Sequence, residues 1–142
     1  MQNRRSFIKQ SCAFCIGAIG LGAVATQLSA CAPMVVFKGE VQKSKILVPF
    51  SAFVAPNSML VVRNSQLAFD ILLIKKTDGT YTALEMKCSH QDNALTATKT
   101  GLFCSTHGSS FDLDGKVLKE PAIEPIHKYK VEIENSAIQI VL

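Results

Sequence analysis

Several common signals are missing from this chain of 142 residues. Beyond residue 33 there is no internal repeat, no low-complexity block and no helical periodicity sustained over three turns. No Ser–His–Asp set, phosphate-binding loop or hydrolase signature is present. An excess of charge of one sign is also missing from the chain after residue 30. Three of the fifteen basic residues precede residue 31, so the rest of the chain has twelve basic and eleven acidic residues. The sequence therefore argues against a helical fold and excludes the basic surface typical of a nucleic-acid-binding protein.

The N-terminal region has the order of an export signal. Arg4, Arg5 and Lys9 precede a stretch without charge that runs from Gln10 to Phe37. A basic start followed by an apolar centre is typical of a signal peptide. The arginine pair resembles a twin-arginine motif, and Leu28-Ser29-Ala30-Cys31 resembles a bacterial lipobox, whose cysteine is lipidated and becomes the first residue of the mature protein. We predict a signal peptide over residues 1–30 and lipid attachment at Cys31.

An uncleaved transmembrane anchor is the alternative for this region. A membrane-spanning helix needs about 20 apolar residues, and Gly17, Gly20 and Gly22 weaken the apolar stretch here. Under either interpretation the rest of the chain is exported. We expect it to be tethered to a bacterial membrane, as a lipid-anchored domain facing the periplasm or the cell exterior.

Short β-prone runs alternate with turn signals in the remainder of the chain. They are Lys45–Phe50, Met59–Arg63, Phe69–Lys75, Tyr81–Met86, Lys128–Glu134 and Ala137–Val141. Thr77-Asp78-Gly79-Thr80 is a hairpin signal, and Asn135-Ser136 links the last two runs. We predict an all-β fold, a small antiparallel domain over residues 45–142, preceded by an anchor and linker over residues 31–44. Residues 88–127 have few strand signals and are predicted to form loops, where function is usually carried.

The five cysteines fall into three groups. Cys12 and Cys15 have the spacing of a redox or metal-binding pair, but inside an export signal that spacing is more simply a coincidence. Cys31 is the predicted lipid site. Cys88 and Cys104 remain, and a structural disulfide between them is the simplest alternative to any chemistry in an exported protein.

The two remaining cysteines each lie close to a histidine, in Cys88-Ser89-His90 and in Cys104-Ser105-Thr106-His107. A two-cysteine, two-histidine zinc finger has a cysteine pair followed by a histidine pair on a helix, whereas both pairs here are mixed. A 2Fe–2S cluster that binds one iron by two thiolates and the other by two imidazoles suits mixed pairs. Such a cluster is neutral when oxidised, so it accepts an electron more readily than an all-cysteine cluster. The pattern favours this cluster, and zinc is the alternative.

The two pairs, with Gly108-Ser109 after the second, resemble the cluster-binding boxes of Rieske iron–sulfur proteins. Asp78–Leu84, Phe111–Val117 and Pro121-Ala122 resemble the hairpin before the boxes, the trailing hairpin and the proline loop of that family. The resemblance covers residues 45–142 and implies a small antiparallel Rieske-type β-sandwich with two cluster-binding loops. It also implies a Rieske-type 2Fe–2S cluster whose ligands are Cys88 and Cys104 on the buried iron and His90 and His107 on the outer iron.

The sequence departs from the Rieske proteins of cytochrome bc complexes at several positions. Their extra cysteine pair, which clamps the two boxes by a disulfide, is replaced by Asn93 and Thr106. Phe111 stands where they have a tyrosine whose hydroxyl donates to a cysteine sulfur. Ser109 is retained, and the resemblance implies a hydrogen bond from it to a bridging sulfide, while Glu120 replaces a glycine. Fewer donors stabilise a reduced cluster less, so we expect a low potential for this family.

Other polar residues are interpreted as structural. His127, the third histidine, is expected at an ordinary surface position. Asp112 and Asp114 resemble a catalytic carboxylate pair, but their Asp-Leu-Asp-Gly setting is typical of a turn.

The resulting hypothesis is a membrane-tethered protein that transfers single electrons to or from redox protein partners, without a substrate site of its own. One alternative is the small Rieske subunit of a larger exported oxidoreductase, a molybdenum enzyme or a quinol-oxidising complex. Another is the ferredoxin of a ring-hydroxylating oxygenase, against which the export signal argues because those ferredoxins are cytoplasmic. No nucleic-acid partner is expected.

Overall fold

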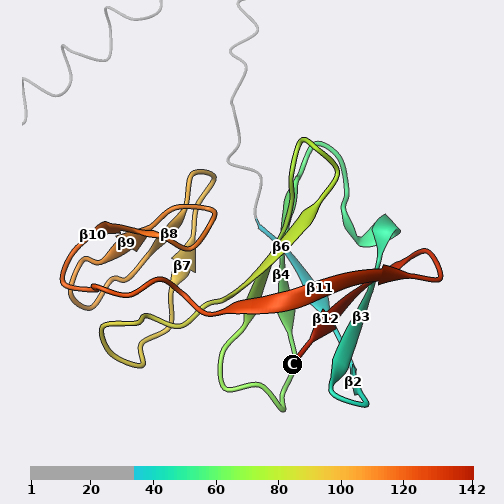
Figure 1. Ribbon diagram of the computed structural model, residues 1–142, viewed down its shortest axis with the longest axis horizontal. Coiled ribbons are helices and arrows are strands. Elements are labelled where there is room, and N and C mark those ends of the chain that lie inside the picture. Colours follow the sequence, from blue (N-terminus) through green and yellow to red (C-terminus); the bar gives the residue numbers. More distant parts are fainter. Residues whose placement is uncertain (1–33) are drawn as a thin grey trace, which may run out of the picture. The chain divides into compact units, whose positions relative to one another are not determined.

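Residues 34–142 are the part of the chain that the computed structural model describes, and their regular structure is almost entirely β-strand (Figure 1). The predicted signal segment, Cys12, Cys15 and the lipid site Cys31 lie outside the described residues. The helical structure of the described part is a single 3-10 turn, Phe50–Ala52. Within residues 34–142, no helix has the length and hydropathy needed to cross a bilayer.

Eight strands form the larger of two sheets. In spatial order they are β1 (Val35–Lys38), β4 (Met59–Arg63), β5 (Ile71–Lys75), β6 (Tyr81–Glu85), β11 (Lys128–Glu134), β12 (Ala137–Val141), β3 (Lys45–Pro49) and β2 (Val41–Gln42). Neighbouring strands are antiparallel except β1 and β4, which are parallel. The predicted antiparallel all-β fold is therefore confirmed, with one parallel pair added.

The larger sheet begins earlier in the chain than the sequence predicts. Residues 35–42 were expected within the linker, but they form β1 and β2, which pair with β4 and β3 at opposite ends of the strand order. One short segment thus joins the two edges of the sheet. Its strand signal is hard to recognise in the sequence because the apolar residues of β1 continue the uncharged stretch that starts at Gln10.

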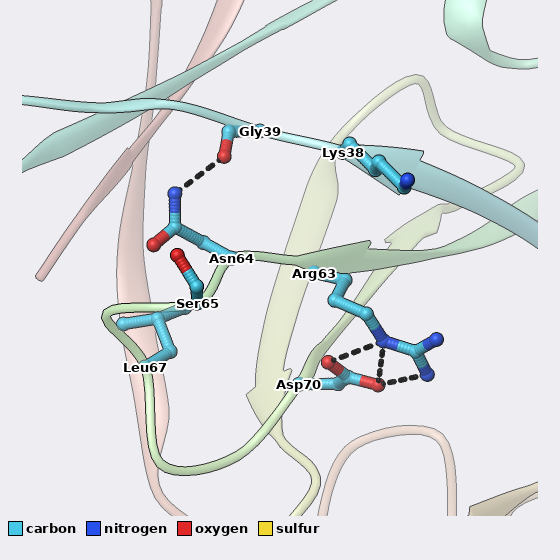
Figure 2. A pocket seen from close by; sticks show the side chains of 7 residues that line it. All are labelled: Lys38, Gly39, Arg63, Asn64, Ser65, Leu67 and Asp70. Atoms are coloured by element: carbon cyan, nitrogen blue, oxygen red, sulfur yellow. Dashed lines mark hydrogen bonds and ion pairs between the residues drawn. The ribbon is translucent and has the colours of Figure 1, made fainter.

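Gly39 makes this closure possible. It lies between β1 and β2, where its N–H donates to the Arg63 carbonyl (3.1 Å) and its carbonyl accepts from Asn64 Nδ2 (2.6 Å; Figure 2). A Cβ atom at this position would lie 2.5 Å from Ile46 Cγ2. A larger residue at position 39 would therefore have to displace the Ile46 side chain of β3.

The three adjacent strands β4, β5 and β6 are buried on both faces. In β5, Ile71 and Leu73 belong to one hydrophobic cluster, and Leu72 and Ile74 belong to another. Successive side chains of a strand point to opposite faces, so a continuous apolar run fills two cores at once. The first cluster fills the interior of the curled eight-stranded sheet, and the second contains Cys88 and Cys104.

A smaller sheet lies within the connection from β6 to β11 and appears at the left of Figure 1. Its strands, in spatial order, are β10 (Val117–Lys119), β9 (Ser110–Phe111), β8 (Leu102–Phe103) and β7 (Thr96–Ala97). The sequence predicted loops over residues 88–127, and two- or three-residue strands are too short to show a pattern. The trailing hairpin implied by the Rieske resemblance corresponds to β9 and β10.

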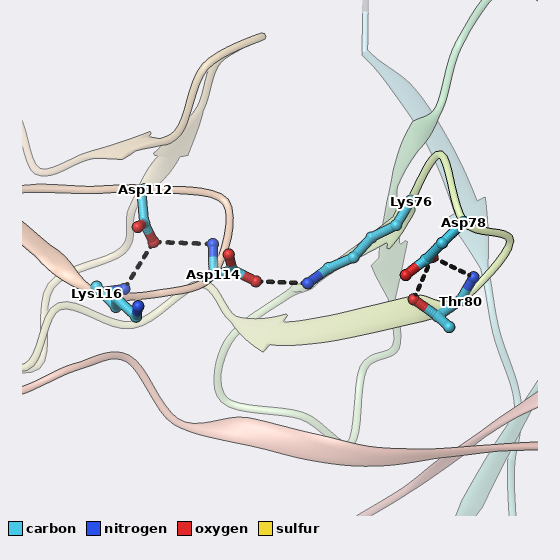
Figure 3. Close-up of polar contacts among 6 residues, drawn as sticks. All are labelled: Lys76, Asp78, Thr80, Asp112, Asp114 and Lys116. Carbon is cyan, nitrogen blue, oxygen red and sulfur yellow. Dashed lines mark hydrogen bonds and ion pairs between the residues drawn. The ribbon is translucent and has the colours of Figure 1, made fainter.

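An ion pair links the turn between β9 and β10 to the end of β5, since Lys76 Nζ lies 2.6 Å from Asp114 Oδ1 (Figure 3). Asp112 Oδ1 accepts the N–H groups of Asp114 and Lys116, both at 2.8 Å. The turn role predicted for the two aspartates is confirmed, and Asp114 also tethers the turn to the larger sheet.

Asp114→Asn tests this tether. The Lys76 hydrogen bond holds the pKa of Asp114 below its ordinary value, so the ionised carboxylate stabilises the folded state above its unfolded pKa of about 4. That stabilisation is lost as the pH falls through the lower folded-state pKa. We expect the variant to unfold at a lower urea concentration at pH 7, and the deficit to shrink below about pH 4. A deficit that stayed constant between these pH values would show that the ion pair is not its cause.

Candidate metal centre

Two loops with the same backbone closure carry the four predicted ligands. Box one follows β6, and the N–H of Cys88 donates to the carbonyl of Asn93 (2.8 Å). Box two follows β8, and the N–H of Cys104 donates to the carbonyl of Ser109 (2.9 Å). In both loops the cysteine is thus bonded to the residue five positions later. Box two is tightened further because Gly108 has a φ of 83° and donates its N–H to the Cys104 carbonyl (3.0 Å).

The boxes separate thiols from imidazoles. Cys88 and Cys104 are each 1% exposed, and both are free thiols, so the alternative of a disulfide is not what the structure shows. His90 and His107 are exposed, and their ring centroids lie 5.0 Å apart with the ring planes at 86°. The loops therefore bring together a buried sulfur pair and a solvent-facing imidazole pair.

The environment of Cys104 favours a thiolate. Burial alone would raise the pKa of this thiol, but the backbone N–H groups of Thr106 and His107 point to the sulfur and lower it below its ordinary value. The Cys88 and Thr106 side chains add smaller effects in the same direction. Since iron binds the thiolate form, the loop prepares this sulfur for a metal.

The donor set fits two metal ions better than one. The donors fall into two pairs, the buried thiols of Cys88 and Cys104 and the exposed imidazoles of His90 and His107. A structural zinc ion requires four donors around one point, whereas a cluster with two irons requires two thiolates on one iron and two imidazoles on the other. The residues present thus suit a 2Fe–2S cluster, with the cysteines toward the core and the histidines toward solvent.

The proline loop contacts both boxes through two serines. Ser89 Oγ donates to the Glu124 carbonyl (2.6 Å), and Ser109 Oγ accepts the N–H of Ala122 (3.0 Å). Ser109 is fully buried, and its own hydroxyl hydrogen remains available for a second partner. Sequence reasoning assigned no role to Ser89, because the carbonyl that it contacts lies 35 residues further along the chain.

Phe111 and His127 were also considered in the sequence analysis, and the structure shows what each of them contacts. Phe111 is buried in the hydrophobic cluster that includes both thiols. His127 is exposed and packs edge-on against Tyr129, with ring centroids 4.8 Å apart. This placement agrees with the surface role expected for His127.

A pocket of about 520 Å³ lies near β1 and the end of β4 and includes no residue of either box. Its charged residues are Lys38, Arg63 and Asp70 (Figure 2). Arg63 and Asp70 form a close ion pair across it, with Arg63 Nη2 2.6 Å from Asp70 Oδ2. The pocket therefore adds nothing to the chemistry of the boxes.

Ser89→Ala should loosen box one, because it removes a hydrogen bond typically worth about 1 kcal/mol. We expect iron release to a chelator, followed by loss of visible absorbance, to become about fivefold faster. Ser105→Ala is the matched control, since Ser105 is an exposed serine of box two. Equal release rates for the two variants would contradict a bracing role for Ser89.

Comparison with solved structures finds the same fold in a Rieske protein, a ferredoxin and a dioxygenase. The plasma membrane Rieske protein PetC3 of the cyanobacterium Synechocystis PCC 6803 is 23% identical, with a TM-score of 0.55 over 66% of this chain and 96% of that one. A ferredoxin of Sphingomonas yanoikuyae B1 is 25% identical, with a TM-score of 0.50 over 69% and 98% of the two chains. A naphthalene 1,2-dioxygenase is 15% identical with a TM-score of 0.55, and the match covers 25% of its chain.

Comparison with curated protein sequences finds no match. The family model of the Rieske [2Fe-2S] domain matches residues 34–130, more than half of the chain. That match includes both boxes, the proline loop and the strands β1 and β2. The protein therefore belongs to the Rieske [2Fe-2S] domain family, and the group that it carries is a Rieske-type 2Fe–2S cluster.

Proposed function

We propose that this protein is an exported, membrane-tethered carrier of single electrons between redox partners, with Cys88, His90, Cys104 and His107 as the cluster ligands. The observation that carries the proposal is the separation of a buried thiol pair from an exposed imidazole pair. When bound, the cluster supplies a one-electron couple.

Different residues of the protein serve two needs of such a carrier, a dry environment for the sulfur atoms and access for a partner. The apolar cluster around Cys88 and Cys104 excludes water from the sulfur side of the site. His90 and His107 present their rings at the surface, where a partner can approach them.

The tether would hold this domain close to a membrane. β1 begins at Val35, four residues after the proposed lipid site Cys31. Four residues span at most about 14 Å when fully extended. A lipid at Cys31 would thus restrict the domain to the layer next to the bilayer and raise its encounter rate with membrane-bound partners.

Electron paramagnetic resonance of the dithionite-reduced protein tests the ligand set. We expect a Rieske-type signal, distinct from that of an all-cysteine cluster, because imidazole donates less charge to iron than thiolate does. His90→Cys or His107→Cys is expected to shift the spectrum away from the Rieske type. A sample containing zinc and no iron would contradict both the cluster and the electron-transfer function.

The reduction potential tests the role of Phe111. We expect a value in the lower part of the Rieske range of roughly −150 to +300 mV, because Phe111 has no hydroxyl to donate to a cysteine sulfur. Phe111→Tyr should raise the potential by about 40 mV, the one-electron equivalent of a hydrogen bond worth about 1 kcal/mol.

Phe103→Tyr, on a partly exposed ring of β8, is the control for this measurement and should leave the potential unchanged. Protein-film voltammetry gives each value. A potential above about +200 mV for the unchanged protein would contradict the interpretation. An unaltered potential in Phe111→Tyr would mean that the ring does not face the cluster.

A further inference from the structure

The proline loop carries the most exposed large apolar side chain of the described residues. Ile123 is 84% exposed. Its two neighbours are fixed to the boxes, since the N–H of Ala122 donates to Ser109 Oγ and the carbonyl of Glu124 accepts from Ser89 Oγ. Ile123 therefore stands on a braced loop, and the two serines that brace it lie within two residues of His90 and His107 in the sequence, although single exposed apolar residues are common on protein surfaces.

The charge around Ile123 supplies an independent observation. We define the cluster tip as residues 88–93, 104–109 and 119–125, which contain three acidic residues, Asp92, Glu120 and Glu124, and one basic residue, Lys119. The net charge of the cluster tip is thus −2, whereas the other described residues carry eleven basic and eight acidic groups, a net +3. The net charge is therefore negative in the part of the domain that carries the histidines and positive in the rest of the described residues.

The two glutamates of the loop are free to face a partner. Asp92 is paired with Lys87 (3.0 Å), but neither Glu120 nor Glu124 has an ion pair with another residue of the described part. Both are exposed and lie within three residues of Ile123. The cluster tip thus combines an exposed apolar side chain with two exposed glutamates, one before it and one after it in the chain, that form no ion pair within the described residues.

We propose that the cluster tip docks a basic redox protein, with Ile123 inserted in an apolar hollow next to the partner's redox centre and Glu120 and Glu124 facing its basic rim. The proposal rests on the proposed electron-transfer function and specifies its partner. Opposite charges steer the encounter, and a central apolar contact holds the complex long enough for transfer. One electron moves from the reduced protein to the oxidised partner, with no bond made or broken.

Cytochrome c, a strongly basic protein with one haem, is the probe for this surface. The full-length holoprotein is mixed with it in two assays. Calorimetric titration of the two oxidised proteins measures binding without electron transfer, and stopped-flow absorbance measures reduction of the ferric haem by the reduced protein. Both the affinity and the second-order rate are expected to fall as ionic strength rises, because salt screens the attraction.

Charge reversal within and outside the cluster tip isolates the acidic residues. Glu124→Lys should lower the second-order rate about fivefold at low ionic strength and flatten its salt dependence. Glu40→Lys is the matched control, because Glu40 is an exposed glutamate of the larger sheet's closing segment, and it should have little effect. A rate that rises with salt, or equal effects of the two variants, would overturn the proposal that the acidic residues of the cluster tip dock a basic partner.

Ile123→Ser isolates the apolar contact. We expect it to weaken binding about tenfold, while Ile133→Ser, at a 60% exposed position in β11, leaves it unchanged. Equal affinities of the two variants would overturn the role of Ile123.

The two assays separate this proposal from the function on which it rests. Charge-dependent binding without haem reduction would support the docking surface and contradict electron transfer. Haem reduction that is insensitive to substitution of Glu124 and Ile123 would support electron transfer and contradict the docking surface.

Discussion

Everything in this domain depends on three strands that are buried on both faces. β4, β5 and β6 pack one set of alternating side chains into the interior of the curled sheet and the other set against the smaller sheet. Leu73 and Leu72 are neighbours in the chain, yet they serve different cores. Since the second core contains Cys88 and Cys104, the packing that stabilises the larger sheet also holds these two thiols in place.

Backbone hydrogen bonding then shapes the two loops that carry the proposed ligands. Both boxes close by a bond from the cysteine amide to the carbonyl five residues later, and in box two further amides turn toward the Cys104 sulfur. No cysteine pair joins the boxes here. Instead, residues 122–124 bond to both of them through Ser89 and Ser109. The proline loop thus braces the site and also presents its most exposed apolar residue to solvent.

The sequence was informative where a pattern was long enough to repeat. β4, β11 and β12 begin and end at the predicted residues, because each is a β-prone run of five to seven residues. The Asn135-Ser136 turn, with positive φ at both positions, also defines the boundary between β11 and β12. The strands of the smaller sheet have two or three residues and leave no such pattern. The four proposed ligands were predicted from their spacing, but the bracing bond of Ser89 depends on a carbonyl that only the folded chain brings near.

The closure of the larger sheet by residues 35–42 has a consequence for how copies of this domain meet at high concentration. An open sheet offers rows of unpaired backbone groups to which a second molecule can add a strand, which is a common route to aggregation. Here the two terminal strands, β1 and β2, are four and two residues long and belong to one continuous segment with Gly39 pressed against Ile46. Such short terminal strands leave only short rows of backbone groups at the edges of this sheet, so they offer a second molecule little to pair with.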